Sequence, residues 1–411
     1  MYDLCIIGCG AAGMSAAITA ARKGLNVVIL EKNNKAGKKL YATGNGRCNL
    51  SNFDIDIKKH YNSSFENYSD FLCQLLNEKS YESIIEFCES IGISITNINN
   101  YIYPHSRQAS SFVWALLDEL NNLNVKIICN CEASKIIKND VLYEIIYNNT
   151  SLFSKNIIIS TGGVSSEALG GSISGINLLS SLDFSIVKPL PSLCSLKIKD
   201  DISVLAGVRT TCTARLLCND SIISTESGEL QLLEHTLSGI VIFNLSSKAI
   251  KLFSSGANPY IEIDFLPDFD MKIIEKATKS NRTIIGFLNG YINDKLATYI
   301  AIKYNIDKKA KIKDLSESLI KEIIYSLKHT RFKISGYGDM ASAQVSSGGL
   351  SLDEINPTTY MTKKYENIYV VGEALDVDGL CGGYNLTFAI LSGIKAGQSI
   401  NDSYKPNKNT N

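Results

Sequence analysis

Residues 3–31 read DLCIIGCGAAGMSAAITAARKGLNVVILE and decide the fold of this chain. A short apolar strand runs into Gly8, Gly10 and Gly13, and an alanine-rich helix and a second apolar strand follow. The first glycine permits a tight turn, the second lets a pyrophosphate approach the backbone, and the third lets helix and strand pack closely. The stretch ends on Glu31, at the distance expected of a carboxylate that accepts from a ribose hydroxyl. The pattern predicts a site for an ADP-containing dinucleotide, and the acid favours FAD or NAD over NADP.

Composition narrows the classes of protein that fit. The 411 residues exceed what one hydrophobic core usually holds, so two domains or an inserted domain are expected. Basic and acidic residues balance at 41 each, so we expect no nucleic-acid partner and no anionic membrane surface. The 11 cysteines form no CxxC pair, which favours reduced thiols in a cytoplasmic protein over disulfides or a metal site. No apolar run is long enough to span a bilayer.

The order of predicted elements indicates one domain split by another. A strand–helix–strand unit opens the chain, short alternating strands and then helices fill the middle, and a strand and helix return at the end. We therefore predict a Rossmann-like α/β dinucleotide-binding domain over 1–192 and 337–411. The inserted substrate or cap domain is predicted over 193–336, β-rich over 193–265 and helical over 270–330.

A second constellation lies near the C-terminus, where residues 368–397 read IYVVGEALDVDGLCGGYNLTFAILSGIKAG. A buried strand delivers Gly372 and Glu373 to the edge of the sheet where ligands of open α/β sheets bind. A carboxylate there can accept from a polyol such as ribityl. Gly383 then precedes a helix whose N-terminal dipole would stabilise the negative charge of a reduced flavin. NAD has neither group, so this second site favours FAD.

The chain resembles, over nearly its full length, a bacterial flavoprotein family that includes the BaiN and YhiN proteins. The resemblance is carried by GKKLYATGNGRCNLSN, YPHSRQASSF, STGG, GELQL followed by LSG, IDFLPD, SSGGLSLDEINPTT and GEALDVDGLCGGYNL. It implies an FAD domain of the glutathione-reductase type, interrupted by a β-barrel-like and helical insert. It also implies that FAD is bound noncovalently.

Together, the motifs and the resemblance give a set of cofactor-binding residues. Residues expected near the pyrophosphate and the adenosine come first in the chain, and residues expected near the ribityl chain and the isoalloxazine ring come last. Ala133 is expected at the adenine. The predicted set is Gly8, Gly10, Ala11, Ala12, Gly13, Glu31, Lys32, Lys39, Gly44, Gly46, Arg47, Cys48, Ala133, Thr161, Gly162, Gly163, Gly372, Glu373, Gly383, Tyr384 and Asn385.

Four residues are candidates for catalysis by their chemistry: Cys381, Tyr384, His235 and His105. Each has a structural alternative: a small buried thiol, a ring packed against the flavin, or a histidine at the surface. Arg47 either contacts phosphate or braces its loop, and we favour phosphate.

Other polar and aromatic residues have simpler interpretations. Asp376 and Asp378 are expected to stabilise a turn rather than act in acid–base chemistry. His60 and His329 are expected to be exposed. A helix over 110–123 is predicted to use Phe112, Trp114, Leu116 and Leu117 as core residues.

The function that these features favour is an FAD-dependent oxidoreductase that exchanges a hydride, through flavin N5, with a small organic substrate. NAD(P)H is a candidate transient electron donor, although the sequence contains no second GxGxxG in a strand–helix context. Two alternatives from other classes stay open: an FAD-dependent RNA-modifying enzyme, and a flavin-bearing redox sensor or binding protein without turnover. The substrate and the oligomeric state are not determined by the sequence.

Overall fold

The computed structural model describes residues 1–400 and divides the chain into two compact units. The first unit contains Met1–Pro189 and the chain from Val345 onward, and the second unit is Leu190–Gln344. The predicted insertion, 193–336, lies inside the second unit, whose ends fall slightly outside those bounds. The cofactor and substrate roles assigned to the two parts stay predictions.

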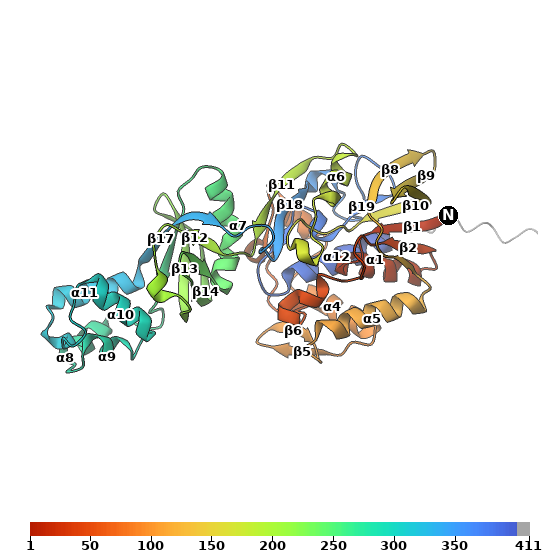
Figure 1. Cartoon of the computed structure of the whole chain (residues 1–411). Helices are drawn as coiled ribbons and strands as arrows, with labels where there is room; N and C mark the ends of the chain where they lie inside the picture. Colours follow the sequence, from red (N-terminus) through yellow and green to blue (C-terminus); the bar gives the residue numbers. More distant parts are fainter. Residues whose placement is uncertain (401–411) are drawn as a thin grey trace, which may run out of the picture. The chain divides into compact units, whose positions relative to one another are not determined.

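A seven-stranded sheet forms the core of the first unit (Figure 1). Its parallel part has the spatial order β7-β2-β1-β10-β19, and β9 and β8 continue antiparallel from the first half of β10. The strands are β1 (Tyr2–Ile7), β2 (Val27–Leu30), β7 (Lys126–Ile128), β8 (Ala133–Asn139), β9 (Leu142–Tyr147), β10 (Thr150–Ile159) and β19 (Ile368–Val370).

The five parallel strands end at the same level in the sheet, because their last residues pair with one another. Ile7 pairs with Leu30 on one side and with Ile159 on the other. The ladder continues outward to Ile128 in β7 and Val370 in β19. Because all five strands point the same way, the segments that follow them emerge together at the edge where ligands of open α/β sheets bind.

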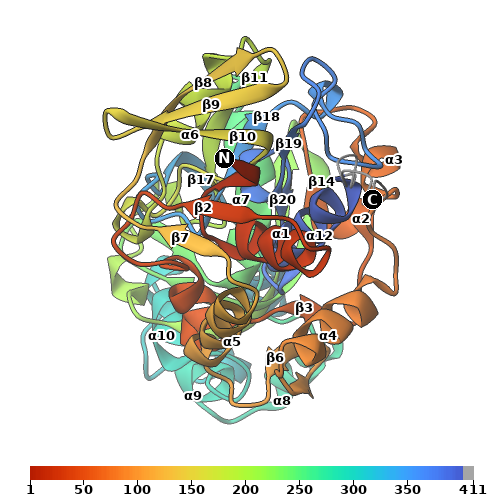
Figure 2. The same cartoon turned by 90° about the vertical axis from the view of Figure 1, so that its right-hand side faces the viewer.

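Two helices pack unusually closely on this sheet. α1 (Ala11–Arg22) and α12 (Tyr384–Ser399) lie side by side in Figures 1 and 2. A Cβ added at Gly393 would lie 2.2 Å from the carbonyl oxygen of Ala12, and one added at Gly397 would lie 2.7 Å from the same helix. The two backbones therefore touch, which explains why α1 is built from small residues.

The remaining elements of the first unit surround this core. α5 (Ala109–Asn122) packs beside α1, and two small sheets have the orders β3-β6-β5 and β20-β4. A further pair joins β11 to β18. The bounds are β3 (Ser51–Asn52), β4 (Tyr61–Asn62), β5 (Ile95–Ile98), β6 (Tyr101–Pro104), β11 (Ile186–Ser192), β18 (Val345–Leu350), β20 (Asp378–Gly379), α2 (Ile57–His60), α3 (Tyr68–Leu72), α4 (Ser80–Ser90) and α6 (Ser174–Ser180).

Helix α5 corrects one prediction about the core. Phe112 and Leu116 are fully buried, but Trp114 is 71 % exposed, so the assignment of Trp114 to the core is wrong. Two positions along a helix rotate a side chain by about 200°, which turns Trp114 away from the face that its neighbours bury. The apolar face is therefore narrower than its composition suggested.

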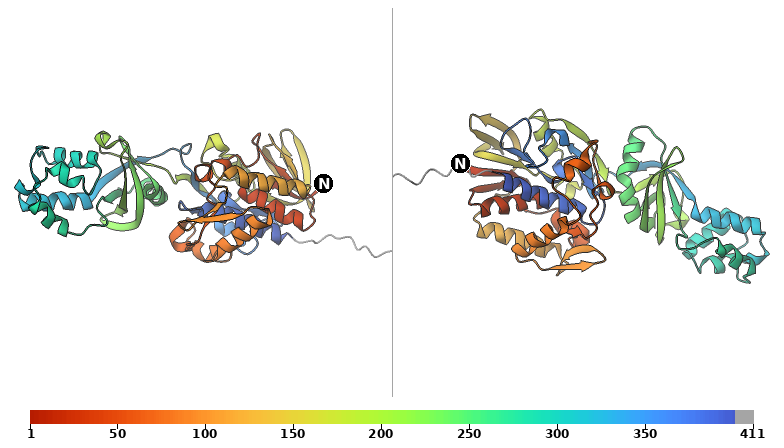
Figure 3. Two further views of the ribbon diagram at one scale, coloured as in Figure 1. Left: turned by 90° about the horizontal axis from the view of Figure 1, so that it is seen from below. Right: turned by 180° about the vertical axis from the view of Figure 1, so that it is seen from behind.

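The second unit contains a closed antiparallel barrel of order β12-β15-β14-β13-β16-β17 (Figure 3). The region 193–265, predicted to be β-rich, also contains the helix α7, so that prediction is incomplete. Buried Val241, Leu245 and Ala249 recur at helical spacing within α7. The bounds are β12 (Leu196–Ile198), β13 (Arg209–Cys218), β14 (Ser221–Leu232), β15 (Thr236–Ser238), α7 (Ile240–Ser254), β16 (Tyr260–Asp264) and β17 (Thr330–Tyr337).

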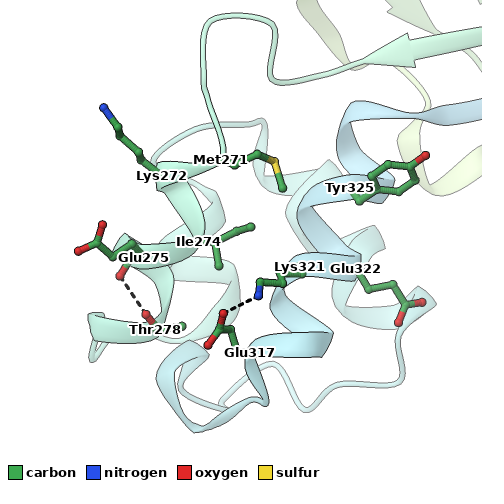
Figure 4. A pocket seen from close by; sticks show the side chains of 9 residues that line it. All are labelled: Met271, Lys272, Ile274, Glu275, Thr278, Glu317, Lys321, Glu322 and Tyr325. Carbon is green, nitrogen blue, oxygen red and sulfur yellow. Dashed lines mark hydrogen bonds and ion pairs between the residues drawn. The ribbon is translucent and has the colours of Figure 1, made fainter.

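Four helices fill the chain between β16 and β17: α8 (Lys272–Lys279), α9 (Ile284–Leu288), α10 (Asp294–Lys303) and α11 (Glu317–Lys328). A cavity of about 840 Å³ lies between α8 and α11 (Figure 4). An ion pair of 2.6 Å between Glu317 and Lys321 borders it. None of the predicted site residues lines this cavity, whose walls are Met271, Lys272, Ile274, Glu275, Thr278, Glu317, Lys321, Glu322 and Tyr325.

Among residues 1–400, no helix combines the length and the apolar character needed to cross a membrane.

The contact between α1 and α12 gives a test of the fold. We expect Gly393→Val to lower the free energy of unfolding by about 1–3 kcal/mol, because the added side chain must push the two backbones apart. Urea unfolding followed by circular dichroism measures the change. Gln398→Val, at an exposed position of the same helix, is the control for helix propensity. Equal stability of the two variants would contradict the close contact.

Candidate functional site

The turn after β1 requires glycine at two positions. Gly8 has φ +105°, and a Cβ there would lie 2.4 Å from the carbonyl oxygen of Ser160. A Cβ at Gly13 would lie 2.1 Å from the carbonyl oxygen of Gly8. Gly10 is different, because nothing lies within 4 Å of the position of its Cβ. The turn therefore packs tightly against β10 and leaves open space at Gly10, where the pyrophosphate is predicted.

Helix α1 begins at this open space. Gly10 is its N-cap residue and offers no side chain to cap the first turn, which also contains no acid. Ala11 and Ala12 are buried and small. The first N–H groups of a helix have no partner within the helix and favour a negative charge. The start of α1 is therefore suited to an anionic ligand such as a diphosphate.

Glu31 lies at the end of β2 and is 7 % exposed. Its Oε2 accepts from the N–H of Cys9 at 2.8 Å, and its Oε1 accepts from the N–H of Asn33 at 2.8 Å and from the amide of the same residue at 2.7 Å. A carboxylate has about four acceptor positions, so one is left for a ribose hydroxyl. Asn33, which orients the acid, was not predicted.

Arg47 directly follows an irregular 3-10 segment over Leu40–Gly46. Gly44, Asn45 and Gly46 have φ of +56°, +54° and +80°, and this left-handed run explains the two glycines. Arg47 is exposed, and within residues 1–400 its guanidinium has no hydrogen bond or ion pair. An unpaired guanidinium beside a glycine-rich turn is suited to a phosphate.

Glu373 is the centre of a polar cluster that the sequence did not predict. Its Oε2 forms an ion pair with Lys39 Nζ at 2.9 Å, and its Oε1 accepts from the N–H of Ser346 at 2.9 Å. The Lys39 ammonium also donates to the hydroxyl of Ser165 at 3.0 Å. A Cβ at Gly163 would lie 2.4 Å from Glu373 Oε1, so this glycine also makes room for the cluster. Lys39 and Glu373, predicted separately as cofactor ligands, are therefore neighbours.

The loop before α12 is held by its own polar side chains. Asn385 accepts from the N–H of Gly379 at 2.8 Å and donates to the carbonyl oxygen of the same residue at 2.7 Å. Gly383 has φ +92°, and a Cβ there would lie 2.7 Å from the nitrogen of Ser51. The hydroxyl of Tyr384 donates to the carbonyl oxygen of Asp54 at 2.9 Å. The side chains of Asn385 and Tyr384 thus shape the loop through hydrogen bonds within the protein.

Asp376 ties this loop to two other segments. It is fully buried, and its carboxylate accepts from the N–H of Ser64 at 2.7 Å, the hydroxyl of Ser63 at 3.1 Å and the N–H of Gly348 at 3.0 Å. These bonds agree with the structural role expected for Asp376. They also extend that role from a local turn to a junction of distant chain segments.

Two buried polar atoms without hydrogen-bond partners lie in segments that are predicted to bind the cofactor. Within residues 1–400 they are Thr161 Oγ1 and Asn49 Oδ1; other such atoms, Ser247 Oγ and Ser326 Oγ among them, lie in the second unit. Thr161 follows β10, and Asn49 belongs to the Arg47 loop. Buried polar groups in proteins are nearly always hydrogen-bonded, so a polar ligand is expected to supply the missing partners. With the open space at Gly10 and the unpaired Arg47, these atoms form a set of groups that fits FAD.

The predicted catalytic residues are not all brought together. Cys381 is half-buried and lies on the same loop as Tyr384. His105 is exposed and follows β6, whose opposite end, Tyr101, is the one beside Cys381. His235 is exposed and belongs to the second unit. The catalytic roles of all four residues stay predictions.

Two of the remaining predicted residues, Lys32 and Gly372, come just after the ends of parallel strands. Ala133 is the first residue of β8, Lys32 directly follows Glu31, and Gly372 directly follows the end of β19. Gly162 has φ +72° and faces open space. Among residues 1–400, no group of three or more His, Cys, Asp or Glu residues could hold a metal ion.

His60 is buried, contrary to the prediction that it is exposed. It is 4 % exposed, and its ring stacks on that of Tyr384 at 4.3 Å between centroids. The surrounding sequence is polar, and the burial comes from a contact more than 300 residues away, so no local signal could have found it. His329 is partly exposed, and its Nδ1 lies 3.2 Å from Oε1 of Glu262.

Thiol reactivity provides a test of this part of the structure. Burial raises the pKa of Cys48 to about 12, while Cys73 is exposed. Because only the thiolate reacts, we expect Cys73 to be alkylated at pH 8 and Cys48 to react only when the protein unfolds. Mass spectrometry of peptides after iodoacetamide treatment measures both. Rapid alkylation of Cys48 in the folded protein would contradict the burial of this side chain.

Comparison with known proteins places the chain in a family. Residues 2–399 match the family described as HI0933-like protein Rossmann domain. A Clostridium scindens relative, named 3-dehydro-bile acid delta(4,6)-reductase, is 32% identical over 408 residues, which cover 97% of this chain and 99% of the relative. A Haemophilus influenzae relative, named ribosomal RNA dihydrouridine synthase, is 25% identical over 404 residues, which cover 96% and 97%.

Solved structures agree at the level of the fold. The 3-ketosteroid delta1-dehydrogenase from Sterolibacterium denitrificans aligns with a TM-score of 0.50 and 12% identity, over 97% of this chain and 99% of that chain. The expectation of no nucleic-acid partner is not supported, because relatives include a protein named for ribosomal RNA. The match over nearly the whole chain nevertheless decides the family: this chain belongs to the HI0933-like Rossmann family and is an FAD-dependent oxidoreductase.

Proposed function

We propose that this chain binds FAD noncovalently in its first unit and uses it to transfer a hydride to a small organic substrate. One observation carries the proposal: five parallel strands end on one line, and the segments after them present glycine turns and carboxylates at one edge. When bound, FAD supplies a position, flavin N5, that accepts and donates hydride. The protein's contribution is to bind, orient and shield this group.

Each part of the edge has a proposed role. The turn at Gly10 and the start of α1 bind the pyrophosphate, and Glu31 accepts from the adenosine ribose. Arg47 pairs with a phosphate, since its guanidinium has no partner among the described residues. Glu373, fixed by Lys39, accepts from a ribityl hydroxyl. Glu31 has one acceptor position left, and among residues 1–400 Oε2 of Glu373 accepts only from Lys39, which supports these roles.

We further propose that the substrate carries a carbon–carbon double bond conjugated to a carbonyl group. Such a bond accepts hydride at the carbon remote from the carbonyl and a proton at the adjacent carbon. The support comes from the Clostridium scindens relative, whose name describes the reduction of such bonds in a 3-dehydro-bile acid. NADH or NADPH is proposed as a transient donor of electrons, without a dedicated domain of its own.

Cofactor binding is tested with the purified full-length protein. We expect flavin absorbance, and we expect Arg47→Leu to raise the Kd for FAD about tenfold because a charge-assisted bond to phosphate is lost. Lys79→Leu removes another exposed cation of the same unit and serves as the control. Titration of apoprotein with FAD gives each Kd. A folded protein that does not bind FAD would refute the proposal.

The substrate class is tested by mixing under anaerobic conditions. Protein reduced by NADH or NADPH, or by dithionite if neither reacts, is mixed with a 3-oxo-4,6-diene steroid, the saturated 3-oxo steroid or a ribosomal RNA transcript. We expect the diene alone to restore the absorbance of oxidised flavin. Reoxidation by the transcript, with none by the diene, would replace the small-molecule substrate with RNA.

A further inference from the structure

A segment of the first unit, residues 54–62, holds the loop that precedes α12. Its β4 pairs antiparallel with β20 (Asp378–Gly379) in that loop. The N–H of Leu380 then donates to the carbonyl oxygen of His60 at 2.9 Å. The segment and the loop are therefore joined by strand pairing at Asp378 and Gly379 and by a main-chain hydrogen bond at Leu380.

The same segment fixes Tyr384 at the end of the loop. The His60 ring stacks on the Tyr384 ring with an interplanar angle of 18° and a centroid distance of 4.3 Å. The hydroxyl of Tyr61 donates to the carbonyl oxygen of Tyr384 at 3.1 Å, and the Tyr384 hydroxyl donates to the carbonyl oxygen of Asp54. Ring, hydroxyl and main chain of Tyr384 are thus all held by residues 54–62.

His60 acts in this contact as a neutral ring. Its Nδ1 accepts from the N–H of Asp56 at 3.1 Å, which leaves the proton on Nε2. Burial lowers the pKa of His60; the nearby Asp54 and Asp56 oppose the shift and Lys59 adds to it. Nε2 lies 3.9 Å from the Asp54 carboxylate, and the ring of Tyr384 covers one face. The His60 ring is buried and has one nitrogen bound to the backbone, so it is suited to pack against Tyr384 and to orient that side chain.

Tyr384 is itself the first residue of α12, and Gly383 packs tightly just before it. Gly383 is the N-cap residue of this helix, and a Cβ there would lie only 2.7 Å from the nitrogen of Ser51. With so little free space, a shift of the Tyr384 ring moves the first turn of the helix. Those N–H groups are the ones proposed to face the electron-rich edge of the flavin.

We propose that His60 is a positioning residue for the cofactor ring: by stacking on Tyr384 it fixes the first turn of α12 against the isoalloxazine. The inference rests on the proposed function, because it requires FAD at this edge of the sheet. The His60 side chain is buried against Tyr384, so we expect the ring to act on the cofactor through Tyr384.

Two variants of His60 separate the ring from its hydrogen bond. His60→Asn keeps an acceptor for the N–H of Asp56 and removes the ring, whereas His60→Phe keeps the ring and removes the acceptor. Phe184→Leu removes a different aromatic contact of the same unit, with Tyr365, and controls for a general loss of stability. The measurements are the Kd for FAD, the flavin absorption maximum, the midpoint potential and the melting temperature.

We expect His60→Asn to raise the Kd for FAD about two- to tenfold and to shift the absorption maximum and the potential. His60→Phe should recover most of the wild-type values, and Phe184→Leu should change only the melting temperature. A folded His60→Asn protein with the wild-type Kd, spectrum and potential overturns the inference. A wild-type protein that binds no FAD instead overturns the proposed function.

Tyr61→Phe tests the inference where His60→Asn does not fold. It keeps every ring and removes only the hydrogen bond to the main chain of Tyr384. We expect a smaller rise in Kd and a spectral shift in the same direction. A folded Tyr61→Phe protein that is identical to wild type in both properties also overturns the inference.

Discussion

The site depends on the register of the hydrogen bonds between five parallel strands. Because of this register, the five strands end at the same level in the sheet. Ile7 is paired on both sides, so the turn at Gly8, the acid Glu31 and the Thr161 segment begin at the same level. A slip of one residue would displace a strand end by about 3.3 Å and turn its side chains to the opposite face. The register of the sheet therefore sets the alignment of groups that are distant in sequence.

Close backbone contact is the second requirement. Gly13 lets the first turn of α1 lie against the turn at Gly8. Gly393 lets α12 lie against Ala12 of α1. Gly393 meets Ala12 and Gly397 meets Ala16, so the two helices run parallel and their N-termini point in the same direction. Helix N-termini favour negative charge, so this common direction suits an anionic, electron-rich cofactor.

Buried polar groups then join segments that the sheet does not connect. Glu373 is bound to Lys39 across 334 positions of sequence, and Asp376 is bound to Ser63 across 313. A buried carboxylate is costly unless it is paired and hydrogen-bonded, so the fully buried Asp376 requires its remote partners, while Glu373 is only partly buried. The loop before α12 is thereby fixed from several directions, with Tyr384 packed against residues 54–62 as part of the same arrangement.

Elements whose signals are local could be predicted from the amino-acid sequence. The glycine spacing after β1, the acid after β2 and the helical periodicity of α5 and α12 are all read within about 30 residues, because turn geometry and amphipathicity are properties of short segments. Only the tertiary structure decided that Trp114 is exposed, that His60 is buried and that Lys39 pairs with Glu373. Burial and ion pairing depend on which distant segments meet, and no short-range pattern records that choice.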